Sequence, residues 1–158
     1  MKNKFPSFLI GLVAGLAIAV LIILVVVPKS LFTVTESKYD FNETVALLEE
    51  STKTQSWSLP HQYNLQATMT KHGFEVKPVK VFSICKPDLA KRILETDADR
   101  HIAAMMPCRI AVFEKSDGKT YIARINARML SKLLGSNAKS VMSEAGAGSE
   151  MILAPLFE

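Results

Sequence analysis

The chain has 158 residues and a formal net charge of +4, from 19 lysines and arginines against 15 aspartates and glutamates. Three of the lysines flank an apolar N-terminal run, so residues 30–158 are close to neutral, with 16 basic and 15 acidic side chains. Because no basic run is interleaved with aromatic residues, the composition argues against a nucleic-acid partner.

An uninterrupted run of apolar and small residues, Phe8 to Val27, is predicted to cross a membrane. Twenty helical residues rise about 30 Å, which is the hydrocarbon thickness of a bilayer. No charged side chain lies between Lys4 and Lys29. A cleaved signal peptide is the alternative, but its apolar core would have only about 7–15 residues and would end at a small-residue cleavage site. The run therefore favours an uncleaved signal anchor.

The basic residues before this run set its predicted orientation. Lys2 and Lys4 form a positive flank that favours the cytoplasmic side. We therefore expect residues 1–29 to be a single-pass anchor in the inner (cytoplasmic) membrane. Residues 30–158 would then form a periplasmic, or more generally extracytoplasmic, domain.

The sequence of the predicted anchor also allows contacts with a second membrane helix. Gly11 and Gly15 are four residues apart, a spacing that lets two lipid-embedded helices approach closely. Such small residues are also common in membrane helices that make no such contact. A homodimer and a larger membrane complex therefore stay open as partners.

The first half of the exported part predicts alternating strands and helices. In chain order these are a strand at 31–37, a helix from 40 to about 55, an extended segment at 57–61, a helix at 63–71 closed by Gly73, and a strand at 76–85. Asp40 and Glu43 have the spacing of a capping box at the first helix. In the last strand, Phe82 and Ile84 alternate with Ser83 and so define one apolar face.

The second half adds a hairpin and more helices. In chain order these are a helix at 87–95, extended segments at 102–106 and 109–114, a turn at 116–119, a strand at 121–125, a helix at 129–134 closed by Gly135, and a last helix from near 137. Asp117 and Gly118 supply the positive φ angles of a tight hairpin. Gly146 and Gly148 are expected to loosen the last helix before 150–157. The sequence thus predicts a two-layer α+β domain, with helices on one face of a mostly antiparallel sheet.

Two short segments carry the candidate chemistry. Cys85 ends one predicted strand and Cys108 begins another, so antiparallel pairing of these strands would bring the two sulfurs to one edge of the sheet. Lys86 and Arg109 follow the two thiols directly and would lower their pKa, which favours the reactive thiolate.

Several ligands could join the two thiols. Met105 and Met106 add thioethers, which together with thiolates select copper(I) among common metals. His101 is a further candidate ligand. The alternatives at this site are a structural disulfide or inert buried thiols, a redox-active pair, and a metal site that holds copper or haem iron.

Specific catalytic and metal motifs are absent from the sequence. It contains no CxxC, CxxCH, HExxH, GxSxG, P-loop or GxGxxG pattern. Hydrolase, kinase and dinucleotide-dependent activities therefore have no positive support, and whether the chain is an enzyme stays open.

Several segments together resemble a known family. They are Lys38-Tyr39-Asp40-Phe41 with Thr44-Val45, Cys85-Lys86-Pro87, Met106-Pro107-Cys108-Arg109 through Glu114, Asp117-Gly118 and Asn126. Over about residues 35–153 the chain resembles the domain of unknown function 302 family, and within it the subgroup that carries both cysteine segments. The resemblance implies a compact α+β domain, often found as a dimer, with no settled activity. Since other members lack these cysteines, the fold does not require them, which favours a functional role.

Two hypotheses follow for the exported domain. In the first, the Cys85 and Cys108 pair carries thiol redox chemistry or binds a soft metal or haem. In the second, the domain is a non-catalytic accessory subunit of a membrane protein complex, and the cysteines only brace the sheet.

Overall fold

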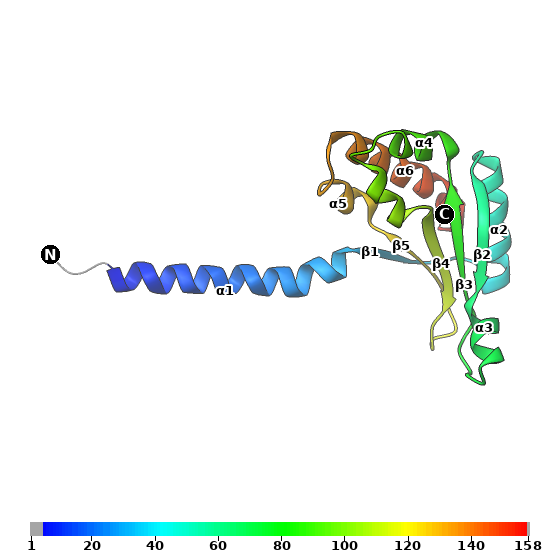
Figure 1. The fold of residues 1–158 in the computed structure, drawn as a ribbon. Helices are drawn as coiled ribbons and strands as arrows, with labels where there is room; N and C mark the ends of the chain where they lie inside the picture. Colours follow the sequence, from blue (N-terminus) through cyan, green and yellow to red (C-terminus); the bar gives the residue numbers. More distant parts are fainter. Residues whose placement is uncertain (1–4, 158) are drawn as a thin grey trace.

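The structure is a computed structural model and describes residues 5–157. A long N-terminal helix projects away from an α+β domain (Figure 1). In chain order the elements are α1 (Phe5–Ser30), β1 (Phe32–Glu36), α2 (Phe41–Thr54), β2 (Ser58–Asn64), α3 (Leu65–Lys71), β3 (Val79–Cys85), α4 (Pro87–Leu94), the 3-10 helix η1 (Arg100–Met105), β4 (Cys108–Glu114), β5 (Thr120–Ile125), α5 (Ala127–Ser131), α6 (Ser136–Leu153) and the 3-10 helix η2 (Ala154–Leu156).

Helix α1 has the properties that were predicted for the anchor. Its segment Ile10–Ser30 has a mean hydropathy of 3.3 in its most apolar window, and none of that window is buried. By length and composition this helix is able to cross a membrane, although a signal sequence has the same properties. Lys2 and Lys4, on which the predicted orientation depends, lie outside the described residues.

The five strands form one sheet in the order β1-β5-β4-β3-β2. All four pairings are antiparallel. The two central pairings, of β3 with β4 and of β4 with β5, join strands from the second half of the chain, and β1 and β2 lie at the two edges. This confirms the predicted α+β class with an antiparallel sheet.

One face of the sheet forms the core with helices α2, α4 and α6. Five fully buried side chains from the three central strands line this face: Phe82, Ile84, Ile110, Val112 and Ile122. They are at most 1% exposed and pack in one cluster with apolar residues of the helices. Each such side chain contributes about 1.5–3 kcal/mol by leaving water, so this alternating pattern holds the two layers together.

The start of α2 confirms the predicted cap. The Asp40 side chain accepts a hydrogen bond of 2.9 Å from the backbone N–H of Glu43. This bond satisfies one of the amide groups that a helix N-terminus leaves without an intrahelical partner.

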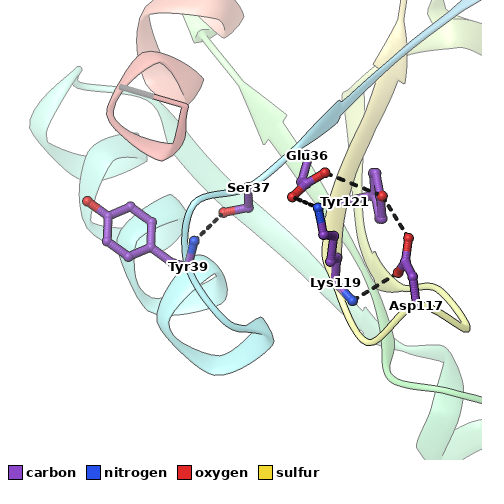
Figure 2. Close-up of polar contacts among 6 residues, drawn as sticks. All are labelled: Glu36, Ser37, Tyr39, Asp117, Lys119 and Tyr121. Atoms are coloured by element: carbon purple, nitrogen blue, oxygen red, sulfur yellow. Dashed lines mark hydrogen bonds and ion pairs between the residues drawn. The ribbon is translucent and has the colours of Figure 1, made fainter.

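The β4–β5 hairpin confirms the predicted turn, but of its two central residues Gly118 alone has the predicted positive φ, and Asp117 does not. Gly118 has φ of +77°, a conformation that side chains with a Cβ rarely adopt. Asp117 accepts hydrogen bonds from the backbone N–H of Lys119 and from the Tyr121 hydroxyl, both 2.9 Å long. The Lys119 ammonium also pairs with Glu36 of β1 at 2.7 Å (Figure 2). The turn is therefore tied to the neighbouring edge strand.

Two expectations for the second half were wrong. Residues 102–106 were predicted to be extended, but Arg100–Met105 form η1, whose Ile102 side chain enters the core. Gly146 and Gly148 do not interrupt α6, which is continuous over Ser136–Leu153. Their lack of a side chain serves packing instead, because a Cβ at Gly148 would lie 2.5 Å from the ring of Trp57.

Candidate functional site

The two cysteines lie at the same end of two neighbouring strands, as predicted. In the antiparallel pairing of β3 with β4, Ile84 is directly opposite Cys108, and Cys85 is the next residue of β3. On its other side Cys85 is opposite Ser58 of β2, whose hydroxyl donates a hydrogen bond of 2.8 Å to the Cys85 carbonyl. Both thiols are free and half-buried.

A small cavity of about 50 Å³ lies behind this strand end and is lined by both cysteines. Three methionines also line it: Met105 and Met106 from η1 and its C-terminal end, and Met142 from α6. Most of the other lining side chains are apolar: Trp57, Ile84, Leu89, Ala90, Ile93, Ile102, Pro107, Ala138, Val141 and Ala145. Two cysteines and three methionines thus line one mostly apolar space, which we call the sulfur cavity.

Burial raises the pKa of both thiols. For Cys85, loss of solvation is the cause. For Cys108 loss of solvation is again the largest cause, and a thiolate at Cys85 would raise the pKa further, while a backbone hydrogen bond acts in the opposite direction. The direction is opposite to the one expected from Lys86 and Arg109. The pair is therefore protonated at neutral pH, unless a bound cation replaces the protons.

The predicted site residues are only partly brought together. Cys85, Cys108, Met105, Met106 and Lys86 all line the sulfur cavity. His101 lies on η1, is exposed and does not line this cavity. Arg109 lines a different, larger cavity and lies over the ring of Tyr63, 5.7 Å from its centroid. Within residues 5–157, no group of three or more His, Cys, Asp and Glu side chains has the arrangement of a metal site.

Sequence reasoning missed Met142 and Trp57. Both reach the cavity through packing of elements that are remote in the sequence, α6 and the segment before β2. Trp57 is the only tryptophan of the chain, is 6% exposed and packs against Gly148 of α6. The pair of α6 glycines was the available signal, since glycine inside a helix often marks a close approach of another element.

The antiparallel sheet with helices on one face, and the cysteine-bearing strand end, define a single α+β domain without a recognised catalytic motif. Residues 32–154 match the family described as "Domain of unknown function DUF302", and the chain belongs to this family. No curated protein matches the chain. A solved structure similar to it is that of an uncharacterized conserved protein DUF302 from Bacillus stearothermophilus, with a TM-score of 0.70 and 20% identity. The match covers 80% of this chain and 98% of the other, and at this identity it shows the fold alone.

Proposed function

We propose that this chain is a membrane-anchored, extracytoplasmic DUF302 domain that binds a soft metal ion, copper(I), in its sulfur cavity. The observation that carries the proposal is the convergence of Cys85, Cys108, Met105, Met106 and Met142 on one small apolar space. Thiolate and thioether ligands select copper(I) over harder cations. The proposal includes membership of the subgroup with both cysteine segments.

The size and polarity of the cavity favour an ion over the other chemistries considered. A space of about 50 Å³ is far smaller than the pockets of several hundred Å³ that hold cofactors of the size of haem. The raised pKa of both thiols disfavours thiolate attack on a disulfide. A copper(I) ion would displace the two thiol protons, so the affinity would rise with pH.

The anchor supports the extracytoplasmic location. Helix α1 is apolar over Ile10–Ser30, and none of its most apolar window is buried. A reporter tests this location: alkaline phosphatase fused to the C-terminus should be active if the domain is exported. Activity only of a reporter that works in the cytoplasm would contradict both the location and the oxidising environment.

Metal binding is tested with the full chain in neutral detergent under anaerobic conditions. Copper(I), or silver(I) as a redox-inert substitute, is titrated against a chromophoric competitor, and we expect one ion per chain. Cys85→Ser and Cys108→Ser should each abolish this binding and leave the fold intact. Met105→Leu, Met106→Leu and Met142→Leu should weaken it.

The matched control is Met151→Leu, because Met151 is on α6 like Met142 but is exposed and outside the cavity. X-ray absorption of the loaded protein should show sulfur ligands alone. Binding that persists in both cysteine variants would overturn the proposal. A disulfide that forms readily in air, without metal binding, would support a redox pair instead.

An accessory role in a membrane complex is the second candidate. It is supported by exposed apolar side chains on the uncovered face of the sheet, next to the anchor: Phe32, Val34 and Ile125 are 59%, 48% and 41% exposed. Phe32 and Ile125 are direct partners across β1 and β5, so they form one patch. A colourless, metal-free protein with unreactive cysteines would favour this role.

A further inference from the structure

A second cavity, with a volume of about 530 Å³, lies between the ends of β4 and β5 and helices α5 and α6. We call it the arginine groove. Small residues of α6 line this space, among them Gly146, which lets α5 pack closely because an added Cβ would lie 2.6 Å from the Cβ of Ala127. The volume is in the range of about 300–1,000 Å³ that is typical of small-molecule sites.

The groove carries an excess of positive charge. Arg109, Arg124 and Arg128 line it, and Glu150 is the acidic residue among the lining side chains. Arg124 is only 8% exposed and is fully engaged, with two hydrogen bonds to Glu150 of 2.8 and 2.6 Å and one to Thr35 of 2.9 Å. Glu150 therefore neutralises the charge of Arg124, and the positive charges of Arg109 and Arg128 stay without an acidic partner in the groove.

Arg109 and Arg128 are both available to a ligand. They are exposed, and within residues 5–157 neither is in an ion pair with a carboxylate. Arg109 contacts only the ring of Tyr63, which leaves its N–H donors free. Two arginines that line one cavity suit a phosphate or a carboxylate, which accept paired hydrogen bonds from arginine.

The remaining residues that line the groove are partly polar, with Thr33, Ser143 and Ser149, and partly apolar. Ile125, Leu130, Met142 and Ala147 line it together with Met105. A ligand that contacts both the arginines and these apolar residues must combine an anionic group with a hydrocarbon part.

The groove is also fixed to the end of the anchor helix. Asn126, which lines it, donates a side-chain hydrogen bond of 3.1 Å to the Ser30 carbonyl and a backbone hydrogen bond of 2.8 Å to the Leu31 carbonyl. Its side-chain oxygen accepts the N–H of Met129 and so caps α5. If α1 spans the bilayer, as proposed above, one wall of the groove lies at the level of the lipid headgroups.

We propose that the arginine groove binds an amphipathic anion, a phosphate or carboxylate group carried on an acyl chain. Arg109 and Arg128 contact the anionic group, and the apolar residues contact the chain. The ligand is either an anionic phospholipid of the adjacent membrane or a free fatty acid. Only the phospholipid source rests on the proposed membrane location, and neither source rests on the metal site.

The experiment uses the metal-free full chain in micelles of an uncharged detergent and counts bound ligands by native mass spectrometry. The probes are oleate and dioleoyl phosphatidylglycerol. Monoolein has the acyl chain without the charge, and inorganic phosphate has the charge without the chain. We expect one molecule of an amphipathic anion per chain, and no comparable binding of monoolein or phosphate.

A double variant, Arg109→Gln with Arg128→Gln, should weaken this binding about 100-fold, since each lost charged hydrogen bond accounts for about tenfold. The matched control is Arg92→Gln with Arg100→Gln, a half-buried and an exposed arginine outside the groove that should leave the affinity unchanged. Preference for phosphatidylglycerol over oleate identifies the membrane lipid as the source, and the reverse identifies the free acid.

Two results would overturn the proposal. One is binding of monoolein as tight as that of oleate, and the other is an equal loss of affinity in the control pair. Both would mean that the probes only adsorb to the micelle. Because copper(I) titration of the same preparation is read separately, failure of the metal site would leave this result unaffected.

Discussion

The two ends of strand β4 differ in how their polar groups are satisfied. At the hairpin end, Asp117, Lys119, Tyr121 and Glu36 form a connected set of hydrogen bonds and one ion pair (Figure 2). Helices α4 and α6 lie toward the other end of the sheet (Figure 1). Residues at this end line the sulfur cavity. There both thiols are free, and the hydroxyl of Ser83 is the one buried side-chain oxygen or nitrogen of residues 5–157 without a hydrogen-bond partner.

This difference suggests a division of roles within one sheet. At the hairpin end, the side chains of Asp117, Lys119, Tyr121 and Glu36 find partners within the domain. The cysteine end contains donors, acceptors and soft ligands in excess of what the fold uses. Groups left without an internal partner in a folded domain are often found at functional sites, so this end is where a ligand is expected.

The largest expected effect on stability comes from a larger side chain in the packed region near the cysteine end of the sheet. In Gly148→Val the new side chain would meet the buried Trp57 ring, so we expect a loss of about 3 kcal/mol in the free energy of unfolding. Denaturant unfolding followed by circular dichroism measures this loss. The control is Gly135→Ser at the start of α6, where no atom lies within 4 Å of an added Cβ and serine is a favoured cap. Equal stability of the Gly148→Val variant would show that Trp57 does not pack as described.

The second prediction contrasts one buried hydroxyl from each end. Near the hairpin, the fully buried Thr44 hydroxyl lies 2.7 Å from the Ser37 hydroxyl and donates to the Tyr39 carbonyl at 3.2 Å. Thr44→Val should therefore cost about 2 kcal/mol, because it removes both contacts and takes this donor away from the Tyr39 carbonyl. Ser83→Ala, at the cysteine end, should stabilise the protein by about 1 kcal/mol, because it removes a hydroxyl that has no partner.

The urea-unfolding midpoint should fall in Thr44→Val and rise in Ser83→Ala, and this result would support the contrast between the two ends. A loss of stability in Ser83→Ala of the same size as in Thr44→Val would contradict it. Such a result would mean that Ser83 has a partner at the cysteine end.

The third prediction concerns the backbone of the hairpin. Gly118 has positive φ and no neighbouring atom within 4 Å of an added Cβ, so a substitution there acts through strain alone. Gly118→Val should cost about 1–2 kcal/mol, because β-branched residues resist this region. Gly118→Asn is the matched control and should cost much less, since asparagine tolerates positive φ. A melting temperature that is unchanged in the valine variant would contradict the turn.

Local sequence signals were enough to predict most of this fold. The cap at Asp40, the turn at Asp117-Gly118 and the alternation of Phe82 and Ile84 are set by residues within a few positions of one another. The sequence made a shared cysteine site conditional on antiparallel pairing of the two strands, and the structure shows that pairing.

What the sequence did not reveal depends on contacts between remote elements. Met142 joins the sulfur cavity only because α6 packs across the sheet, and no local pattern marks it. The charge of the arginine groove likewise depends on Glu150 pairing with Arg124, 26 positions away. The thiol pKa was predicted in the wrong direction because burial, which opposes ionisation, is a property of the folded chain.

The smallest expected effect is a loss of stability at alkaline pH. The two ends of the sheet should contribute to this loss in different pH ranges. Burial raises the pKa of both thiols above their ordinary 9.0, so the unfolded chain loses these protons at lower pH than the folded chain. Their contribution to stability is therefore present below about pH 9 and is lost as the pH rises through the folded-state pKa values. The hairpin end also loses stability as the pH rises, but at higher pH. The hydrogen bond to Glu36 raises the pKa of Lys119 above 10.5, and the hydrogen bond to Asp117 raises the pKa of Tyr121 above 10.0.

Unfolding free energies of three proteins, measured from about pH 8 to about pH 11 under reducing, metal-free conditions, resolve the two contributions. The double variant Cys85→Ser with Cys108→Ser should lose the decline that begins near pH 9 and retain the later one. Glu36→Gln should retain the decline that begins near pH 9 and reduce the later one, because it removes the partner that holds the proton on Lys119 and leaves the bond between Tyr121 and Asp117 in place. If the cysteine variant declined like the unmodified chain, the thiols would have the same pKa in both states. The cysteine end would then be as open to water as the hairpin.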